Sequence, residues 1–503
     1  MNSLPLLSLV IFLPWVGAAL LAVSPRLAVR AVRPLALGFS LSTLALGLWL
    51  TSQFDPSAGL QFTEQHAWIP SLHVSYHLGL DGMSLLLVLL TGLVAPAALA
   101  ASWRDARDVR FAAILFLLLQ GAALGVFLAL DFFHWFVFWE LSLVPAFFLI
   151  KLWGGAGASR AAYQFVIYTI GGSAFMLAGF AALYVAAGTL DFTQLAALRA
   201  DGTLTARLGD GWTTAVFLGV FIGLAVKVPL FPFHTWLPAA YAEAPTGASM
   251  FLTGVMSKMG VYGFLRILWP LFPGELQAWA TPLLWLALGG VVFGALAALR
   301  QTDLKRLVAY SSVNHLSYCL LALFAIAATS QPSPDAAASA LSGALLQMFN
   351  HGLSASALFF CVGVLEARSG GKRGLDDFGG VRTAMPVFAG LCGIAMFSSL
   401  GLPGLNGFVG EFLIFRGVFG LAPWAAATAT IGLLATALFL LTFWQRVFHG
   451  PQRGAVSTYK DVSNREIALL IPGIGLMFAL GVMPQLVIWI FNPLVTSWVE
   501  ALP

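Results

Sequence analysis

The stretch AVFLGVFIGLAVKVP, residues 215–229, is an apolar run of twelve residues that ends in Lys227 and then Pro229. A proline two residues after the lysine removes a backbone donor and bends or breaks a helix. An interrupted helix at membrane depth is tolerated only where it lines protein or a water-filled cavity. The stretch therefore predicts a broken membrane-spanning helix with a buried lysine at its break.

The composition of the whole chain agrees with a membrane location. Of 503 residues, 59% are hydrophobic and only 9% are charged, against about 25% charged residues in a soluble domain. So few charges cannot cover a water-facing surface, which excludes a soluble enzyme and a disordered chain. A nucleic-acid binder is excluded as well, despite the net charge of +4. We predict an all-α polytopic membrane protein.

Apolar runs near the length of about 20 residues that a spanning helix needs occur about fourteen times. They are 3–23, 32–51, 82–101, 111–130, 132–151, 161–187, 211–232, 247–269, 280–299, 305–328, 338–364, 383–422, 424–448 and 463–484. The first run lacks a basic leader and a cleavage site, so we expect a span rather than a signal peptide. The twelfth is too long for one plain helix and contains a break at 401–404.

Loop charge predicts the orientation of these spans. Of 25 lysines and arginines, 19 lie in or beside odd-numbered loops and three in even-numbered loops. By the positive-inside rule the odd-numbered loops are cytoplasmic. We therefore expect a multi-pass protein with both termini on the non-cytoplasmic side.

The chain offers no site for a redox centre or a nucleotide. Its three cysteines, Cys319, Cys361 and Cys392, lie in apolar runs without a CxxC pair, which argues against a Cys-ligated iron–sulfur cluster. No phosphate-binding glycine motif is present. We expect no cofactor on this chain.

Ionisable residues inside the spans are the candidate functional residues. They are Glu140, Lys227, Lys258, His315, His351 and Glu411. Such groups cost a few kcal/mol or more at membrane depth, so they face the bundle interior and are functional by default. A lysine away from water can exchange a proton, and histidine changes charge near neutral pH. These residue types in one membrane protein predict proton transfer.

Each residue also has a purely structural interpretation. Glu140 can serve a structural ion pair, Lys227 can extend to the interface, and either histidine can be an ordinary core histidine. The glycines from 401 to 410 near Glu411 can serve close helix packing instead of a break. A metal site is disfavoured because no span contains an HxxxH or HExxH spacing.

Two breaks beside buried charges, at Lys227 and Glu411, lie five spans apart. Helices an odd number of spans apart run in opposite directions, and such pairs indicate inverted repeats around an ion site. We predict two five-helix repeats, 111–269 and 280–448, with broken seventh and twelfth helices. Flanking helices occupy 1–110, and the fourteenth helix and tail occupy 449–503.

Several longer motifs, in order along nearly the whole chain, resemble one known family. They are Trp68-Ile-Pro-Ser-Leu, Tyr76-His-Leu-Gly-Leu-Asp81-Gly, Phe138-Trp-Glu140-Leu, Lys227-Val-Pro, Pro232-Phe-His234-Thr-Trp-Leu-Pro238, Glu243-Ala-Pro245-Thr, Asp303-Leu-Lys-Arg-Leu-Val-Ala-Tyr-Ser-Ser, Asn350-His351-Gly-Leu-Ser and Leu402-Pro-Gly-Leu-Asn-Gly-Phe-Val-Gly-Glu411-Phe. The family is that of the antiporter-like membrane subunits of respiratory complex I, the proton-pumping NADH:quinone oxidoreductase. Subunits of multisubunit cation/proton antiporters and membrane-bound hydrogenases are similar.

Within this family the glutamate at 411 resembles the M, or subunit-4, type, because the L and N types carry lysine there. The resemblance implies that Glu140 and Lys227 form the coupling pair, that Lys258, His315 and His351 form the central path, and that Glu411 is the terminal proton site. Ala239 and Tyr241 stand where relatives often carry a charged residue and a histidine. That departure puts a role of this loop in proton entry in doubt.

The resemblance also implies the surroundings of the chain. NADH, FMN, iron–sulfur clusters and quinone would bind to partner subunits, and the L-type and N-type chains would be neighbours in a bacterial-type inner membrane, with lipid and without nucleic acid. A cation/proton antiporter subunit driven by an existing gradient is the first alternative, and Glu411 in place of lysine argues against it. The second alternative is a non-pumping scaffold. A scaffold needs no buried charges, so the buried charges of this chain argue against it.

Overall fold

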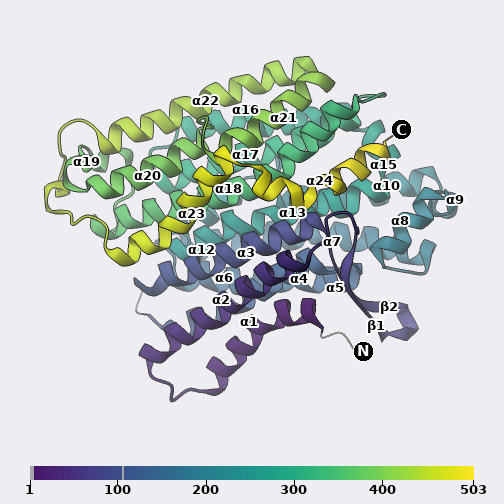
Figure 1. Ribbon diagram of the computed structural model, residues 1–503, viewed down its shortest axis with the longest axis horizontal. Coiled ribbons are helices and arrows are strands. Elements are labelled where there is room, and N and C mark those ends of the chain that lie inside the picture. The colour runs from purple at the N-terminus through teal and green to yellow at the C-terminus, as the bar shows by residue number, and fades with distance from the viewer. Residues whose placement is uncertain (1–4, 105–106, 503) are drawn as a thin grey trace.

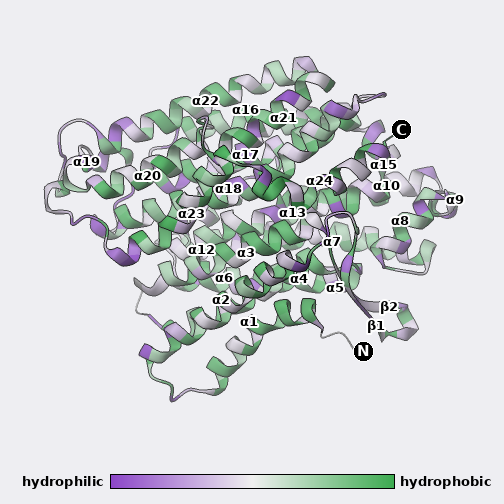
Figure 2. Ribbon diagram, in the orientation of Figure 1, coloured by the Kyte–Doolittle hydropathy of each residue, from purple (hydrophilic) through white to green (hydrophobic). Residues whose placement is uncertain are grey.

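The computed structural model describes residues 5–104 and 107–502, so the first two residues of the predicted span 3–23 lie outside the described part. The chain forms a bundle of long, roughly parallel and antiparallel helices (Figure 1). Apolar residues cover the middle of the bundle, while polar residues gather at helix ends and in loops (Figure 2). The distribution is the one expected of a membrane-spanning bundle.

Helices of the first half follow the predicted spans closely. They are α1 Leu6–Val23, α2 Val29–Gln53, α3 Gly82–Ala101, α4 Val109–Leu128, α5 Phe132–Leu141, α6 Leu143–Trp153, α7 Ala158–Ala187, α8 Phe192–Ala200, α9 Thr203–Leu208, α10 Asp210–Lys227 and α11 Leu237–Glu243. The fifth span bends at Ser142, between α5 and α6. The seventh is interrupted between α10 and α11, as predicted.

The eighth span is an interrupted helix that runs from 246 to 271. It consists of α12 Thr246–Phe251, a π-helical turn η3 Leu252–Met256, α13 Ser257–Gly263, a second π-helical turn η4 Phe264–Leu268 and α14 Trp269–Leu271. The apolar pattern of the sequence does not predict these wide turns, which often mark functional sites.

Helices of the second half complete the bundle. They are α15 Pro273–Ala278, α16 Ala280–Leu299, α17 Leu304–Ala327, α18 Pro334–Arg368, α19 Val381–Ala384, α20 Pro386–Ser399, α21 Asn406–Leu421, α22 Pro423–Phe448, α23 Asn464–Val482 and α24 Gln485–Glu500. The twelfth span breaks between α20 and α21, as predicted. The predicted tail after the fourteenth span forms α24.

Twelve helical segments of the described chain are each long and apolar enough to cross a membrane. The two remaining predicted spans reach that length only as interrupted helices, 246–271 and 386–421. The predicted count of about fourteen therefore agrees with the structure once broken helices are included. Both α17 and α18 lie almost wholly inside the bundle.

A hairpin outside the spans is the main addition to the predicted helices. Strands β1 Gln61–Ile69 and β2 Val74–Leu80 pair antiparallel. The hairpin lies with α8 and α9 at the end of the bundle where α1 begins and α24 ends (Figure 1). The two ends of the described chain thus share one side of the bundle.

Candidate functional site

Lys258 is the centre of the site. It is the second residue of α13, which follows η3 directly, and it is completely buried. Its Nζ donates to the Thr253 carbonyl at 2.6 Å and the Ser257 hydroxyl at 3.3 Å, and lies 2.8 Å from His351 Nδ1. An ammonium group has three N–H donors. The site therefore provides one acceptor for each proton of a charged lysine, and one of those acceptors is a titratable base.

Three further predicted residues continue the chain of contacts. The rings of His351 on α18 and His315 on α17 have their centroids 5.3 Å apart. His315 Nδ1 lies 3.0 Å from the Glu411 Oε1 atom on α21. At most 5% of the surface of each of these residues is exposed. We call Lys258, His351, His315 and Glu411 the central line; the structure brings these four predicted residues together.

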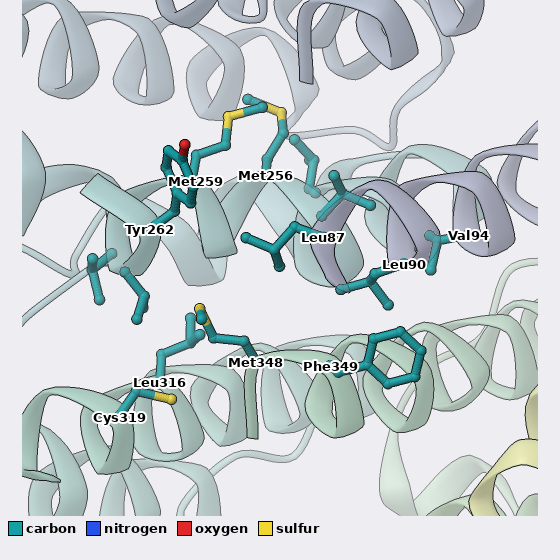
Figure 3. Close-up of a cluster of buried hydrophobic side chains, with 14 of the residues drawn as sticks. Leu87, Leu90, Val94, Met256, Met259, Tyr262, Leu316, Cys319, Met348 and Phe349 are labelled. Carbon is teal, nitrogen blue, oxygen red and sulfur yellow. The ribbon is translucent and has the colours of Figure 1, made fainter. Parts of the chain in front are cut away.

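Apolar packing encloses the elements that carry the central line. Figure 3 shows side chains from α3, the eighth helix, α17 and α18 gathered in one cluster. Labelled members are Leu87, Leu90, Val94, Met256, Met259, Tyr262, Leu316, Cys319, Met348 and Phe349. This packing holds together α13, α17 and α18, the helices that carry Lys258, His315 and His351.

The break before α21 positions Glu411. Gly401 and Gly404 adopt positive φ angles of 78° and 92°, which favour glycine, in the turn after α20. The Ser398 hydroxyl donates to Asn406 Oδ1 at 2.6 Å, and Asn350 Nδ2 donates to the Asn406 carbonyl at 2.7 Å. These bonds hold the beginning of α21 against α20 and α18.

Close packing, the alternative reading of these glycines, also applies to two of them. A Cβ atom at Gly407 would overlap the Ser398 carbonyl, and one at Gly410 would lie 2.7 Å from Gln347 Oε1. The segment therefore combines a glycine turn with a close helix contact.

Lys227 occupies the break in the seventh span. It is the last residue of α10 and is buried. The carbonyls that the break frees find other donors: Leu230 N donates to Ala225 O, and the Trp236 indole donates to Val226 O, both at 2.9 Å. Lys227 Nζ donates to Ser142 Oγ at 3.4 Å and lies 4.7 Å from the Trp139 ring centroid.

Glu140 lies at the edge of the bundle rather than in the central line. It lines an apolar groove of about 560 Å³ between α5, α6 and α7. Its Oε1 atom is buried without a hydrogen-bond partner among the described residues. The described contacts contain no direct ion pair between Glu140 and Lys227; Ser142 and Trp139 contact the lysine instead. The described contacts also do not join Lys227 to the central line.

One polar residue of the site escaped the sequence analysis. Gln347 Nε2 lies 3.4 Å from His315 Nδ1 and 3.5 Å from Glu411 Oε1. Gln347 precedes His351 by one helical turn on α18. Residues at this spacing share a helix face, so the sequence could have indicated Gln347 as a neighbour of His351.

Two basic residues near helix ends lie largely inside the protein and are paired with carboxylates. Arg266 lies in η4 and contacts Asp81 Oδ2 at 2.5 Å. Lys305, in the first turn of α17, contacts Glu366 Oε2 at 2.7 Å. Because a carboxylate partner compensates the lost hydration, both charges can lie inside the protein.

Acidic residues also gather where the hairpin meets the bundle. Asp131 accepts from the Ser75 and Phe133 amides at 3.2 and 2.9 Å, and Asp191 lies 2.5 Å from His77 Nδ1. Burial, with a contribution from the charge of Asp191, raises the pKa of Asp131 to about 6, although the amide donors oppose that rise.

The substitution Asp131→Asn is expected to change the pH dependence of stability. The pKa of Asp131 is higher in the folded than in the unfolded chain, so the folded state loses stability as pH rises from about 4 to about 6 and does not regain it above. The asparagine variant lacks that loss. The unfolding free energy of the variant minus that of the parent should therefore be up to about 3 kcal/mol larger at pH 8 than at pH 4. Thermal unfolding in detergent at both pH values measures this. A difference that does not change with pH would contradict the prediction.

No group of three or more His, Cys, Asp or Glu side chains suited to a metal ion occurs among the residues that the structure describes.

Comparisons with known proteins agree with this architecture. Residues 129–438 match the family described as NADH:quinone oxidoreductase/Mrp antiporter, TM. The chain is 38% identical to the NADH-quinone oxidoreductase subunit M of Rhodobacter capsulatus, over 98% of this chain and 96% of that protein. It is 36% identical to the F(420)H(2) dehydrogenase subunit M of Methanosarcina mazei, over 97% of both chains.

A solved structure shares the fold over the full length. A chain of respiratory complex I from Thermus thermophilus matches with a TM-score of 0.86 and 30% identity, over 99% of this chain and all of that chain. Family model, relatives and structure agree, and the chain therefore belongs to the NADH:quinone oxidoreductase/Mrp antiporter membrane family, on its subunit M branch.

Proposed function

We propose that this chain is a proton-translocating membrane-arm subunit of an NADH:quinone oxidoreductase, coupling distant quinone reduction to proton transfer. The observation that supports it is the central line, four buried ionisable residues in successive contact from α13 to α21. Buried charges without such a purpose are expensive in a membrane protein.

The geometry supports a simple sequence of proton shifts. A charged Lys258 can pass one proton to His351 Nδ1, after which the histidine donates back to the neutral amine. His315 is the next carrier; its Nε2 is buried without a hydrogen-bond partner among the described residues, and a water molecule there would link the two rings. His315 Nδ1 then faces Glu411, the proposed terminal proton site.

Glu140 and Lys227 are proposed as the coupling pair. Two unit charges brought to about 4 Å interact by roughly 4 kcal/mol at an effective dielectric of about 20. Moving one charge against 100 mV needs about 2.3 kcal/mol. A change in a neighbouring subunit that brings Glu140 toward Lys227, or moves it away, would therefore supply enough energy for one proton.

The substitution Glu140→Gln is expected to uncouple this step. The amide keeps the size of the side chain but removes its charge, so the number of protons moved per electron, the turnover, or both should fall severalfold. Proton uptake and NADH oxidation measured together in membrane vesicles test this. Glu500→Gln, at the exposed end of α24, is the control. Unchanged pumping and turnover in the Glu140 variant would refute the coupling role.

The host complex is tested by purification in mild detergent. We expect the tagged chain to elute with NADH:quinone reductase activity and with flavin and iron–sulfur signals, because those cofactors belong on partner subunits. The similarity to an F(420)H(2) dehydrogenase subunit makes reduced F420 the second donor to assay. Elution with membrane subunits but without a redox centre would favour the antiporter alternative, and sodium flux would then be measured.

The remaining assignments are also proposals. We infer that this is a non-redox subunit, that L-type and N-type chains are its neighbours, and that both termini face the non-cytoplasmic side of the inner membrane. We further propose inverted repeats over 111–269 and 280–448, between flanking regions 1–110 and 449–503. The seventh and twelfth helices, which occupy corresponding places in the two repeats, each break beside a buried charge, and this supports the symmetry.

A further inference from the structure

An apolar groove opens between α2 and α23, and no residue of the central line is among those that line it. It encloses about 280 Å³, close to the lower end of the roughly 300–1,000 Å³ of small-molecule sites. Its floor comes from α3 and α18. Its two walls are Leu37, Leu41 and Leu44 on α2 and Leu469, Gly473 and Leu476 on α23. Each wall spans eight residues, and its first and last residues lie about 10 Å apart along the helix.

Two arginines stand at one end of this groove. Arg33 precedes Leu37 by one helical turn, and Arg465 precedes Leu469 by one turn. Both α2 and α23 begin at the same end of the bundle (Figure 1). The walls of the groove therefore carry one guanidinium each, side by side at the same depth.

The two guanidinium groups share a neighbour, Trp103. Arg33 donates to the Trp103 carbonyl at 3.0 Å. Arg465 lies 4.6 Å from the Trp103 ring centroid and donates at 2.9 Å to the carbonyl of Ala100, which itself lines the groove.

Neither arginine has a carboxylate partner within residues 5–104 and 107–502. The Nε atom of Arg33 is buried without any hydrogen-bond partner there. The carboxylate next in sequence, Glu466, bonds to Arg368 at 2.8 Å. Two adjacent cations with no carboxylate partner among the described residues favour an anion, and guanidinium matches phosphate geometry with two parallel hydrogen bonds.

We propose that this groove binds one anionic phospholipid, with an acyl chain between α2 and α23 and its phosphate at Arg33 and Arg465. A free phosphate would use the arginines but not the groove, whereas a neutral lipid would use the groove but not the arginines. The end of the bundle that holds both arginines also carries most of the basic loops, and basic pockets between helices at that face typically bind anionic headgroups.

Photo-crosslinking of the purified complex tests the proposal. The probe is phosphatidylglycerol with a diazirine in the middle of one acyl chain, and the matched probe is phosphatidylcholine with the same chains. We expect phosphatidylglycerol to label peptides that contain 37–44 and 469–476, at least about threefold more than phosphatidylcholine does. Excess inorganic phosphate should not compete.

Variants separate the headgroup from the groove. The double variant Arg33→Gln with Arg465→Gln should lose this labelling by about tenfold, and the corresponding lysine variants should retain most of it. Arg30→Gln, on an exposed position of the same helix, is the matched control and should label normally. Gly473→Leu should block labelling as well, because a side chain there meets no protein atom within 4 Å of its Cβ.

Three outcomes would overturn the proposal. Equal labelling by the two lipids would indicate an ordinary boundary lipid. Labelling that persists in the variant without both arginines would show that they do not bind the headgroup. Absence of labelling in the intact complex, with labelling of the isolated chain, would show that a partner subunit covers the groove.

Discussion

Replacing Lys258 by methionine is expected to lower the rate of proton translocation coupled to quinone reduction by about tenfold or more. The lysine begins the central line, and its Nζ lies 2.8 Å from His351 Nδ1. Methionine has a similar length but carries no proton, so the line loses its first carrier. Proton uptake in vesicles driven by the electron donor measures the effect.

A second variant separates proton exchange from structural charge. Lys258→Arg keeps a positive charge but cannot release a proton under physiological conditions. We expect the arginine variant to assemble into the complex and still fail to pump. Lys151→Met, on α6 and bonded to Tyr163 at 2.8 Å, is the control for loss of a lysine outside the line. Pumping at the parent rate in Lys258→Arg would show that the residue acts only through its charge.

Glu411→Gln is expected to reduce coupled proton release to a similar extent. Glutamine fills the same space and can still bond to His315, whose Nδ1 lies 3.0 Å from the carboxylate, but it cannot accept a proton. The test is the ratio of protons released to electrons transferred, measured beside the assembly of the complex on a native gel.

The conservative change Glu411→Asp provides the comparison. Aspartate retains the acid but is one methylene shorter, so it loses the contact with His315 while remaining titratable. We expect a rate between those of the parent and the glutamine variant. Asp335→Asn, in the exposed first turn of α18, should have no effect. Normal proton release in Glu411→Gln would place the terminal proton site elsewhere.

Features that depend on local chemistry could be predicted from the sequence. The breaks near Pro229 and Gly401 follow from the backbone preferences of proline and glycine. Span positions follow from apolar runs, and the four residues of the central line follow from the rarity of ionisable groups in such runs. The contacts between them, which join residues 93 and 96 positions apart in the sequence, needed the structure.

Other features have no local signature. The π-helical turns on either side of α13 do not show in composition, because one wider turn leaves the apolar pattern nearly unchanged. Arg266 pairs with Asp81 across 185 positions of sequence, so hydropathy alone placed it with the loop charges. The contacts of Lys227 with Ser142 and Trp139, in place of a direct ion pair with Glu140, also depend on how the helices pack.

The inner position of α17 and α18 has a consequence for the response to bilayer thickness. Hydrophobic mismatch acts on helices that touch lipid, through tilt and local deformation. Since these two helices are enclosed by other helices, the spacing between His351, His315 and their partners is insulated from such strain. The chain should therefore keep its intrinsic proton-transfer rate in membranes of different acyl length, while the more exposed α1, α2 and α23 absorb the mismatch.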